Sequence, residues 1–74
     1  MTPTERILLS RETLALYERN GVPAGPVEAT LAMIAAEVVE IHRIAADEPH
    51  RAETLGKLIE RWRRFADGVR MRAN

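Results

Sequence analysis

The chain has 74 residues, no cysteine, and eleven Lys and Arg residues against eleven Asp and Glu residues, so its formal net charge is zero. This length allows one domain, the lack of cysteine excludes a disulfide or thiolate-metal framework, and an apolar share of 46% is too high for an intrinsically disordered chain. The neutral balance also argues against a general nucleic-acid coat protein.

Residues 3–20 are predicted to form a helix, continuous or in two parts. Thr2, Pro3 and Glu5 have the pattern of a capping box followed by a proline in the first turn. Gly21 follows the segment and tolerates the left-handed conformation that ends many helices. The start and the end of this helix are therefore better defined than its interior.

The interior of this segment gives a weaker signal. Leu9 and Leu16 lie on the side opposite Leu14, so no single apolar stripe runs through it. Ser10 is interpreted as the cap of a second helix start. A strand over residues 5–9 followed by a helix, as in ribbon-helix-helix repressors, therefore stays open as an alternative.

A second helix is predicted over residues 26–47, after a loop at residues 20–26 that holds two glycines and two prolines. Its large apolar stripe has spacings of four and three residues and consists of Val27, Leu31, Ile34, Val38, Ile41 and Ala45. A stripe of smaller residues lies well around the far side and consists of Ala29, Ala32, Ala36 and Val39. We expect a helix with two apolar faces to be the central one, with the first helix or a second copy of the chain on the small face.

A tight break at Asp47-Glu48-Pro49 precedes a third helix, predicted over residues 49–69 with a frayed tail over residues 70–74. So short a connection makes the second and third helices antiparallel neighbours. The core-facing stripe of the third helix consists of Leu55, Ile59, Trp62, Ala66 and Val69, widened by Leu58 and Phe65. The chain is expected to be a single all-α domain over residues 1–74. Two architectures fit, a small three-helix bundle or a helical hairpin with an N-terminal helix, and either would associate through the central helix.

The zero net charge hides a dipolar distribution along the chain. Residues 1–50 hold four arginines against eight acidic residues, and residues 51–74 hold seven basic residues against three acidic ones. A basic face of the third helix is assigned to Lys57, Arg61, Arg63, Arg64, Arg70 and Arg72. We interpret it as solvated or paired with acids of this chain or of a second copy. The alternatives are an acidic protein surface or the phosphates of a nucleic acid.

Residues with catalytic or metal-binding chemistry are sparse. The chain has one serine, and no Lys or Ser/Thr follows the glycines of residues 20–26 as in a phosphate-binding loop. Neither Glu37 nor Glu40 has a histidine three residues later, as bundle di-iron sites require, and His42 and His50 are interpreted as surface or boundary residues. We therefore expect no enzyme, cofactor, metal site or small-molecule substrate.

The expected function is that of a non-catalytic protein-binding regulator or inhibitor, which occludes or bridges a partner protein. Such proteins are frequent among those encoded by phages and plasmids. The partner is a second copy, another protein, or both, and the alternative is a transcriptional regulator that binds nucleic acid through the basic face of the third helix. No segment has the length and hydropathy of a membrane span or of a signal peptide, so we expect a cytoplasmic chain without a membrane partner.

Overall fold

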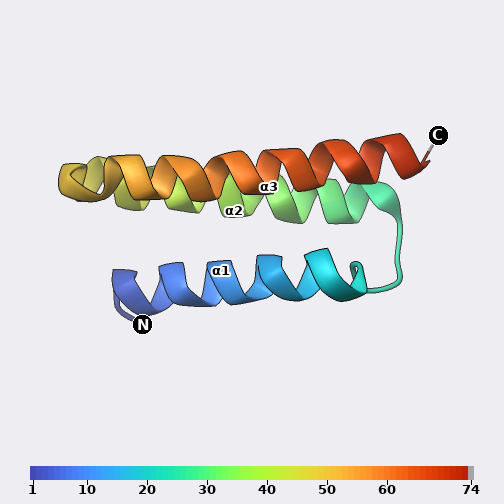
Figure 1. Cartoon of the computed structure of the whole chain (residues 1–74), viewed down its shortest axis with the longest axis horizontal. Helices are drawn as coiled ribbons and strands as arrows, with labels where there is room; N and C mark the ends of the chain where they lie inside the picture. Colours follow the sequence, from blue (N-terminus) through green and yellow to red (C-terminus); the bar gives the residue numbers. More distant parts are fainter. Residues whose placement is uncertain (74) are drawn as a thin grey trace.

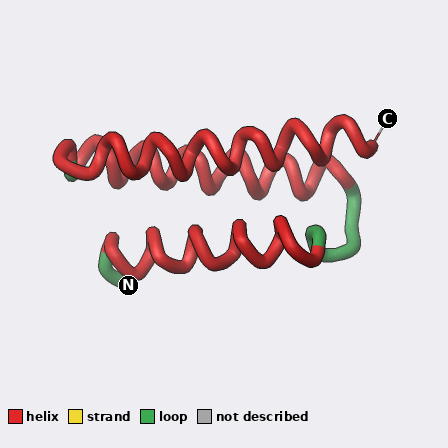
Figure 2. The backbone as a smooth tube through the Cα atoms, viewed as in Figure 1, coloured by secondary structure: helices red, strands yellow, loops and turns green. Residues whose placement is uncertain are grey.

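The computed structural model describes residues 1–73, which form three α-helices and one short 3-10 turn (Figure 1). α1 spans Pro3–Asn20, α2 spans Val27–Asp47, the turn η1 spans Pro49–Arg51, and α3 spans Ala52–Ala73. Figure 2 shows helix and loop but no strand over the described residues. The predicted all-α fold of three helices is therefore confirmed.

The first helix is continuous from its capping box to its glycine stop. The Thr2 side chain accepts a hydrogen bond from the Glu5 backbone N–H, and the Glu5 carboxylate accepts one from the Thr2 N–H, both at 3.1 Å. At the other end the Gly21 N–H donates to the Tyr17 carbonyl at 2.8 Å, and its φ of 81° lies in the left-handed region that favours glycine. The alternative of a strand over residues 5–9 is wrong.

α2 and α3 form an antiparallel hairpin, and α1 runs along one side of it (Figure 1). The two helices of the hairpin lie close together along their length, whereas α1 approaches either of them at fewer points. The short turn at Pro49–Arg51 reverses the chain between them, at the break that the sequence marks with proline. The hairpin is therefore the better-packed part of the fold, and α1 is laid against it.

The last helix is longer than predicted. α3 continues to Ala73, so the prediction that residues 70–74 fray is wrong for residues 70–73, and residue 74 lies outside the described residues. Val69 is buried, and Arg70 pairs with Asp67 at 3.0 Å one turn earlier. Basic residues in a last turn also interact favourably with the helix dipole. These contacts keep the final turns helical.

The core lies where the three helices meet. Its nearly inaccessible side chains come from all of them and include Ile7, Leu14, Ile34, Ile41, Ile44, Leu55, Leu58, Ile59, Trp62 and Ala66. Each fully buried aliphatic side chain contributes about 1.5–3 kcal/mol relative to exposure. Three residues assigned to the core from the sequence, Val27, Leu31 and Val38, are only half-buried. Leu31 and Val38 lie on the side of the hairpin that α1 does not cover, whereas Val27 lines a hollow near the end of α1.

α1 contributes a narrow inner face to this core. Its buried residues are Ile7, Ser10 and Leu14, with Tyr17 half-buried one turn further. Tyr17 packs edge-on against Trp62, at 6.4 Å between ring centroids, and stacks on Phe65 at 6.2 Å. The three aromatic rings of the chain thus join α1 to α3, whereas Leu8, Leu9 and Leu16 on the outer side of α1 stay about half-exposed.

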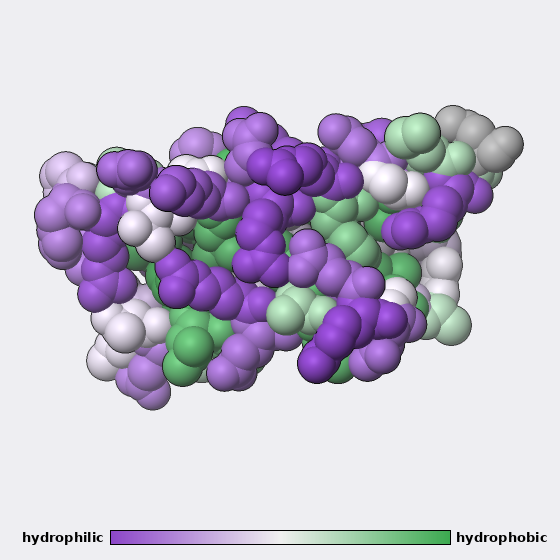
Figure 3. All heavy atoms as spheres, in the orientation of Figure 1, coloured by the Kyte–Doolittle hydropathy of each residue, from purple (hydrophilic) through white to green (hydrophobic). Residues whose placement is uncertain are grey.

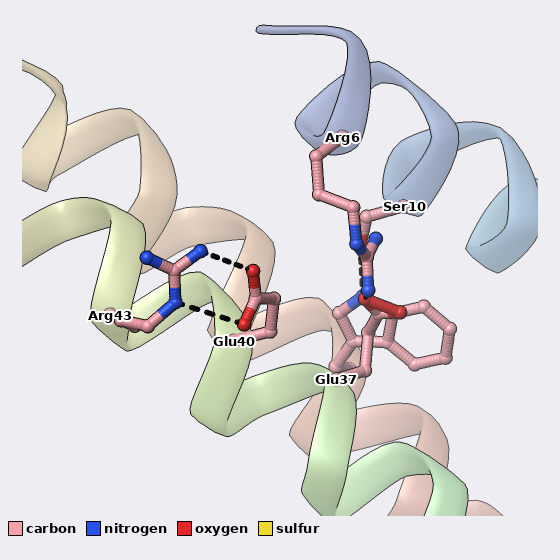
Figure 4. A network of polar contacts seen from close by, with 6 residues as sticks. Arg6, Ser10, Glu37, Glu40 and Arg43 are labelled. Carbon is pink, nitrogen blue, oxygen red and sulfur yellow. Dashed lines mark hydrogen bonds and ion pairs between the residues drawn. The ribbon is translucent and has the colours of Figure 1, made fainter. Parts of the chain in front are cut away.

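Polar contacts fix α1 at several points along its length. In the middle, the indole N–H of Trp62 donates a hydrogen bond to Ser10 Oγ at 2.9 Å, and both residues are almost fully buried. Arg6 forms an ion pair with Glu37 of α2, and Figure 4 shows Arg6 pointing from α1 toward Glu37. Near the ends, Thr4 accepts a hydrogen bond from Arg51 at 2.7 Å, and Glu18 pairs with Arg61 at 2.6 Å. The interpretation of Ser10 as a helix cap is therefore wrong.

Candidate interaction surfaces

The small apolar stripe of α2 is exposed. Ala29, Ala32, Ala36 and Val39 all reach solvent, and Val39 is 67% exposed. α1 packs on a different side of α2, which the ion pair between Arg6 and Glu37 marks. The prediction that α1 covers the small stripe is therefore wrong, and the prediction that a second copy covers it stays a prediction.

This exposed side of α2 carries no charge over most of its length. Between Glu28 and His42 every exposed residue of α2 is alanine or valine, and Ala35 joins the predicted set. Alanine is the best helix former, so an exposed alanine has a local reason to be in a helix. Val39 has no such reason, since β-branched residues form helices less well.

A groove runs between α2 and α3 on the side of the hairpin that faces away from α1, and we call it the open-side groove. It has a volume of about 430 Å³. Its floor consists of Leu31, Ile34, Ala35, Val38 and Ala66, and its rim on α3 consists of Arg63, Asp67 and Arg70. Two half-buried residues of the large α2 stripe, Leu31 and Val38, therefore line an open groove with a charged edge.

The predicted basic face of α3 is divided by acidic residues. Glu53, Glu60 and Asp67 follow one another at intervals of seven residues and lie on the exposed side of the helix. At 100° per residue, Arg63 and Arg70 lie on one side of this acidic line, toward α2, whereas Lys57 and Arg64 lie on the other side, toward α1. Lys57 is within 3.9 Å of Glu53, and Arg70 within 3.0 Å of Asp67. Two of the six predicted basic residues are therefore paired within α3 itself.

Arg11 of α1 lies beside the basic residues on the α1 side of α3, although it was not among the six predicted residues. Arg11 of α1 lines one hollow together with Lys57 and Arg61, and Arg64 lines the adjoining hollow. Arg61 is already paired with Glu18. Arg72 lies apart from them, in a hollow near the end of α1. The six predicted residues thus belong to separate edges of α3 instead of one face.

Glu40 and Arg43, which lie one turn apart on α2, form an ion pair. The Arg43 guanidinium donates two hydrogen bonds to Glu40, at 2.6 and 3.1 Å (Figure 4). These bonds lower the pKa of the Glu40 carboxyl and raise the pKa of Arg43. His42 and His50 are exposed, and within residues 1–73 no three histidine or acidic side chains are arranged so that they could hold a metal ion.

The residues that position α1 were not predicted from the sequence. Arg6, Ser10 and Glu18 make its contacts with the hairpin, and each is polar, so a search for apolar periodicity passes over them. A usable signal was present, because Ser10 falls three residues after Ile7 and four before Leu14, on their own stripe.

The hydrophilic side chains cover most of the face formed by α3 and α1, with smaller hydrophobic patches between the two helices (Figure 3). None of the helices within residues 1–73 is both long enough and apolar enough to cross a bilayer. Comparisons with protein-family models, with curated proteins and with solved structures found no match to this chain.

Proposed function

We propose that this chain is a non-catalytic protein-interaction module of the cytoplasm, which binds a helix of a partner protein in the open-side groove. One observation carries the proposal: α1 covers one side of the α2–α3 hairpin, and the opposite side keeps an apolar groove with a charged rim. A regulator or inhibitor that occludes a partner helix needs a surface of this kind.

The floor of the groove has the spacing of a helix-binding surface. Leu31 and Val38 are seven residues apart, which is about 10.5 Å along α2. Helices that bind in grooves present anchors at i, i+3, i+4 and i+7, so one partner helix can contact both residues. Both side chains are half-buried before binding, and covering them would remove further apolar area from water.

The rim favours carboxylates on the partner. Arg63 forms no ion pair within the described residues, and Arg70 forms an ion pair with Asp67 of the same helix at 3.0 Å. We therefore expect the partner helix to carry Asp or Glu along the edge that faces α3. The exposed Ala32 and Val39 extend the surface around α2, and alanine allows the two helix backbones to approach closely.

The nucleic-acid alternative is less well supported. The acidic line of Glu53, Glu60 and Asp67 lies in the middle of the exposed side of α3, between the two sets of basic residues. A phosphate backbone laid on this side would meet these carboxylates, and like charges at close range repel each other. Protein binding is therefore the function that the geometry supports best.

Site-specific photo-crosslinking in cells that express the chain tests the proposal. A photoreactive residue at Ala35, in the groove, should give protein adducts that the same residue at the exposed Ala52 does not give. The double reversal Arg63→Glu with Arg70→Glu should abolish these adducts while the far-UV circular dichroism stays unchanged. Equal adducts at both positions, or adducts that survive the reversal, would contradict the proposed function.

A further inference from the structure

The rim of the open-side groove has a charge pattern that is complementary to itself. On α3, Arg63, Asp67 and Arg70 border the groove, and Glu60 is exposed two turns before Asp67 on the same acidic line, so the signs of these four residues alternate. Reversing the direction of the helix about Phe65 places position 60 at position 70, and position 63 at position 67. Each acid then meets a base, so an antiparallel contact between two copies of this edge brings opposite charges together.

α2 shows a second pattern of this kind, on its exposed side. Reversal about the point between Ala35 and Ala36 places Glu28 at position 43, which is arginine, and Ala32 at position 39, which is valine. The small alanine thus meets the larger valine, and the acid meets a base. Arg43 already binds Glu40, so the pairing with Glu28 adds less than the pairs on α3.

The two centres of reversal lie at the same level of the hairpin. Ala35 and Ala66 line the same groove, and Ala66 adjoins Phe65 in the sequence. One twofold axis can therefore pass both centres. A twofold axis brings position i of one copy to position j of the other, and j to i, which closes the assembly at two copies.

We propose that the open-side groove is the interface between two copies of this chain, packed with α2 against α2 and α3 against α3, each pair antiparallel. This inference rests on the proposed function and names the partner as a second copy. In the dimer, Arg63 faces Asp67 and Arg70 faces Glu60 of the other copy. The two hairpins form a four-helix core, and each α1 stays on the outside.

Single cysteines test the register directly, because the chain has no cysteine of its own. Ala35→Cys places its thiol beside the twofold axis and should give a disulfide-linked dimer under mild oxidation. Ala46→Cys is the matched control, since it is also exposed on α2 but lies eleven residues from Ala35, about 16 Å along the helix. In an antiparallel dimer the two thiols at position 46 are about twice that distance apart and cannot bond. Equal linking at both positions would overturn the register.

Charge reversal tests the pairing in solution, by sedimentation equilibrium over a range of concentrations. Arg63→Asp and Asp67→Arg, made singly, should each weaken dimerisation by about tenfold or more, since each dimer loses two opposite-charge pairs. The double variant in one chain restores both pairs and should recover most of the affinity. Arg64→Asp, on the other edge of α3, should leave it unchanged.

A monomeric mass at all concentrations, or a double variant no better than the single ones, would refute self-association. The proposed function would then still stand if Ala35 gave adducts with a different protein. Adducts of twice the mass of the chain would instead identify the second copy. If photo-crosslinking found no adduct at all, the proposed function itself would fall.

Discussion

The buried hydrogen bond between Ser10 and Trp62 gives the sharpest test of how α1 is attached. Ser10 is 1% exposed, Trp62 is fully buried, and the indole nitrogen of Trp62 lies 2.9 Å from Ser10 Oγ. Ser10→Ala removes the acceptor and leaves the indole N–H without a partner in the core. A buried polar group left unsatisfied costs about 1–3 kcal/mol.

Two smaller effects modify this cost. Alanine forms helices better than serine, which stabilises the variant by about 0.5 kcal/mol, and the loss of one oxygen atom leaves only a small cavity. The net destabilisation should therefore be about 0.5–2.5 kcal/mol. At about 4–8 °C for each kcal/mol in a domain of this size, the fall in Tm is easy to resolve. Thr13→Ala is the control, because Thr13 lies on the same helix, half-buried. It should gain the helix propensity without losing a buried bond.

A double-mutant cycle separates the bond from its surroundings. Trp62→Phe removes the donor, so Ser10→Ala in that background should cost almost nothing, and the coupling energy should be about 1 kcal/mol or more. Urea unfolding followed by circular dichroism measures all four corners, and fluorescence of the only tryptophan adds a second probe in the variants that keep it. A cost for Ser10→Ala within about 0.5 kcal/mol of zero, or no coupling, would refute the assigned role of the hydrogen bond.

Three further predictions concern the charged residues of α1 and the exposed side of α2. Arg6→Met should cost about 1–3 kcal/mol in urea unfolding, because the Glu37 side chain is only 12% exposed and would lose its ion pair, whereas Arg43→Met at the exposed pair should cost much less. Hydrogen bonds from Thr2 lower the pKa of Glu5 below its ordinary value of 4.5, so the stabilisation by its carboxylate is present above pH 4.5 and lost as the pH falls through the lowered pKa. Melts at pH 7 and pH 3 should therefore show Glu5→Gln converging on the wild type at the lower pH, and a constant difference would contradict this. Ala36→Glu should change the free energy of unfolding by less than about 0.5 kcal/mol at concentrations where the chain is monomeric, since Ala36 is exposed, and a large loss there would place Ala36 in the core.

The helices could be predicted from the sequence because residues at their ends determine where they begin and stop. Thr2, Glu5 and Gly21 form the caps they were predicted to form, and the break before Pro49 gives the antiparallel hairpin. These signals depend on neighbouring residues only. The end of α3 was placed too early, although the burial of Val69 was predicted, because the ion pair of Arg70 with Asp67 in the following turn was not.

The side of the hairpin on which α1 packs could not be predicted in the same way. The stripe around Ala32 and Ala36 was predicted to pack against another helix. Alanine is compatible both with a close helix contact and with exposure on a helix, so the residue type alone does not decide between them. The contacts of Arg6 and Ser10 help to fix the side on which α1 packs, and both residues pair with residues far along the chain. The six basic residues of α3 were likewise grouped by charge, whereas their angles around the helix separate them.

The way α1 is fastened has a consequence for how this chain can vary. Its apolar inner face is narrow, and many helices of similar length could supply one. The tryptophan–serine bond and the flanking pairs act only at one rotation and one axial offset, so a sliding or turning helix loses all of them together. Substitutions should therefore be tolerated along most of α1. A change at any of these anchoring positions would leave a helix that still packs on the hairpin but no longer has one defined rotation and offset.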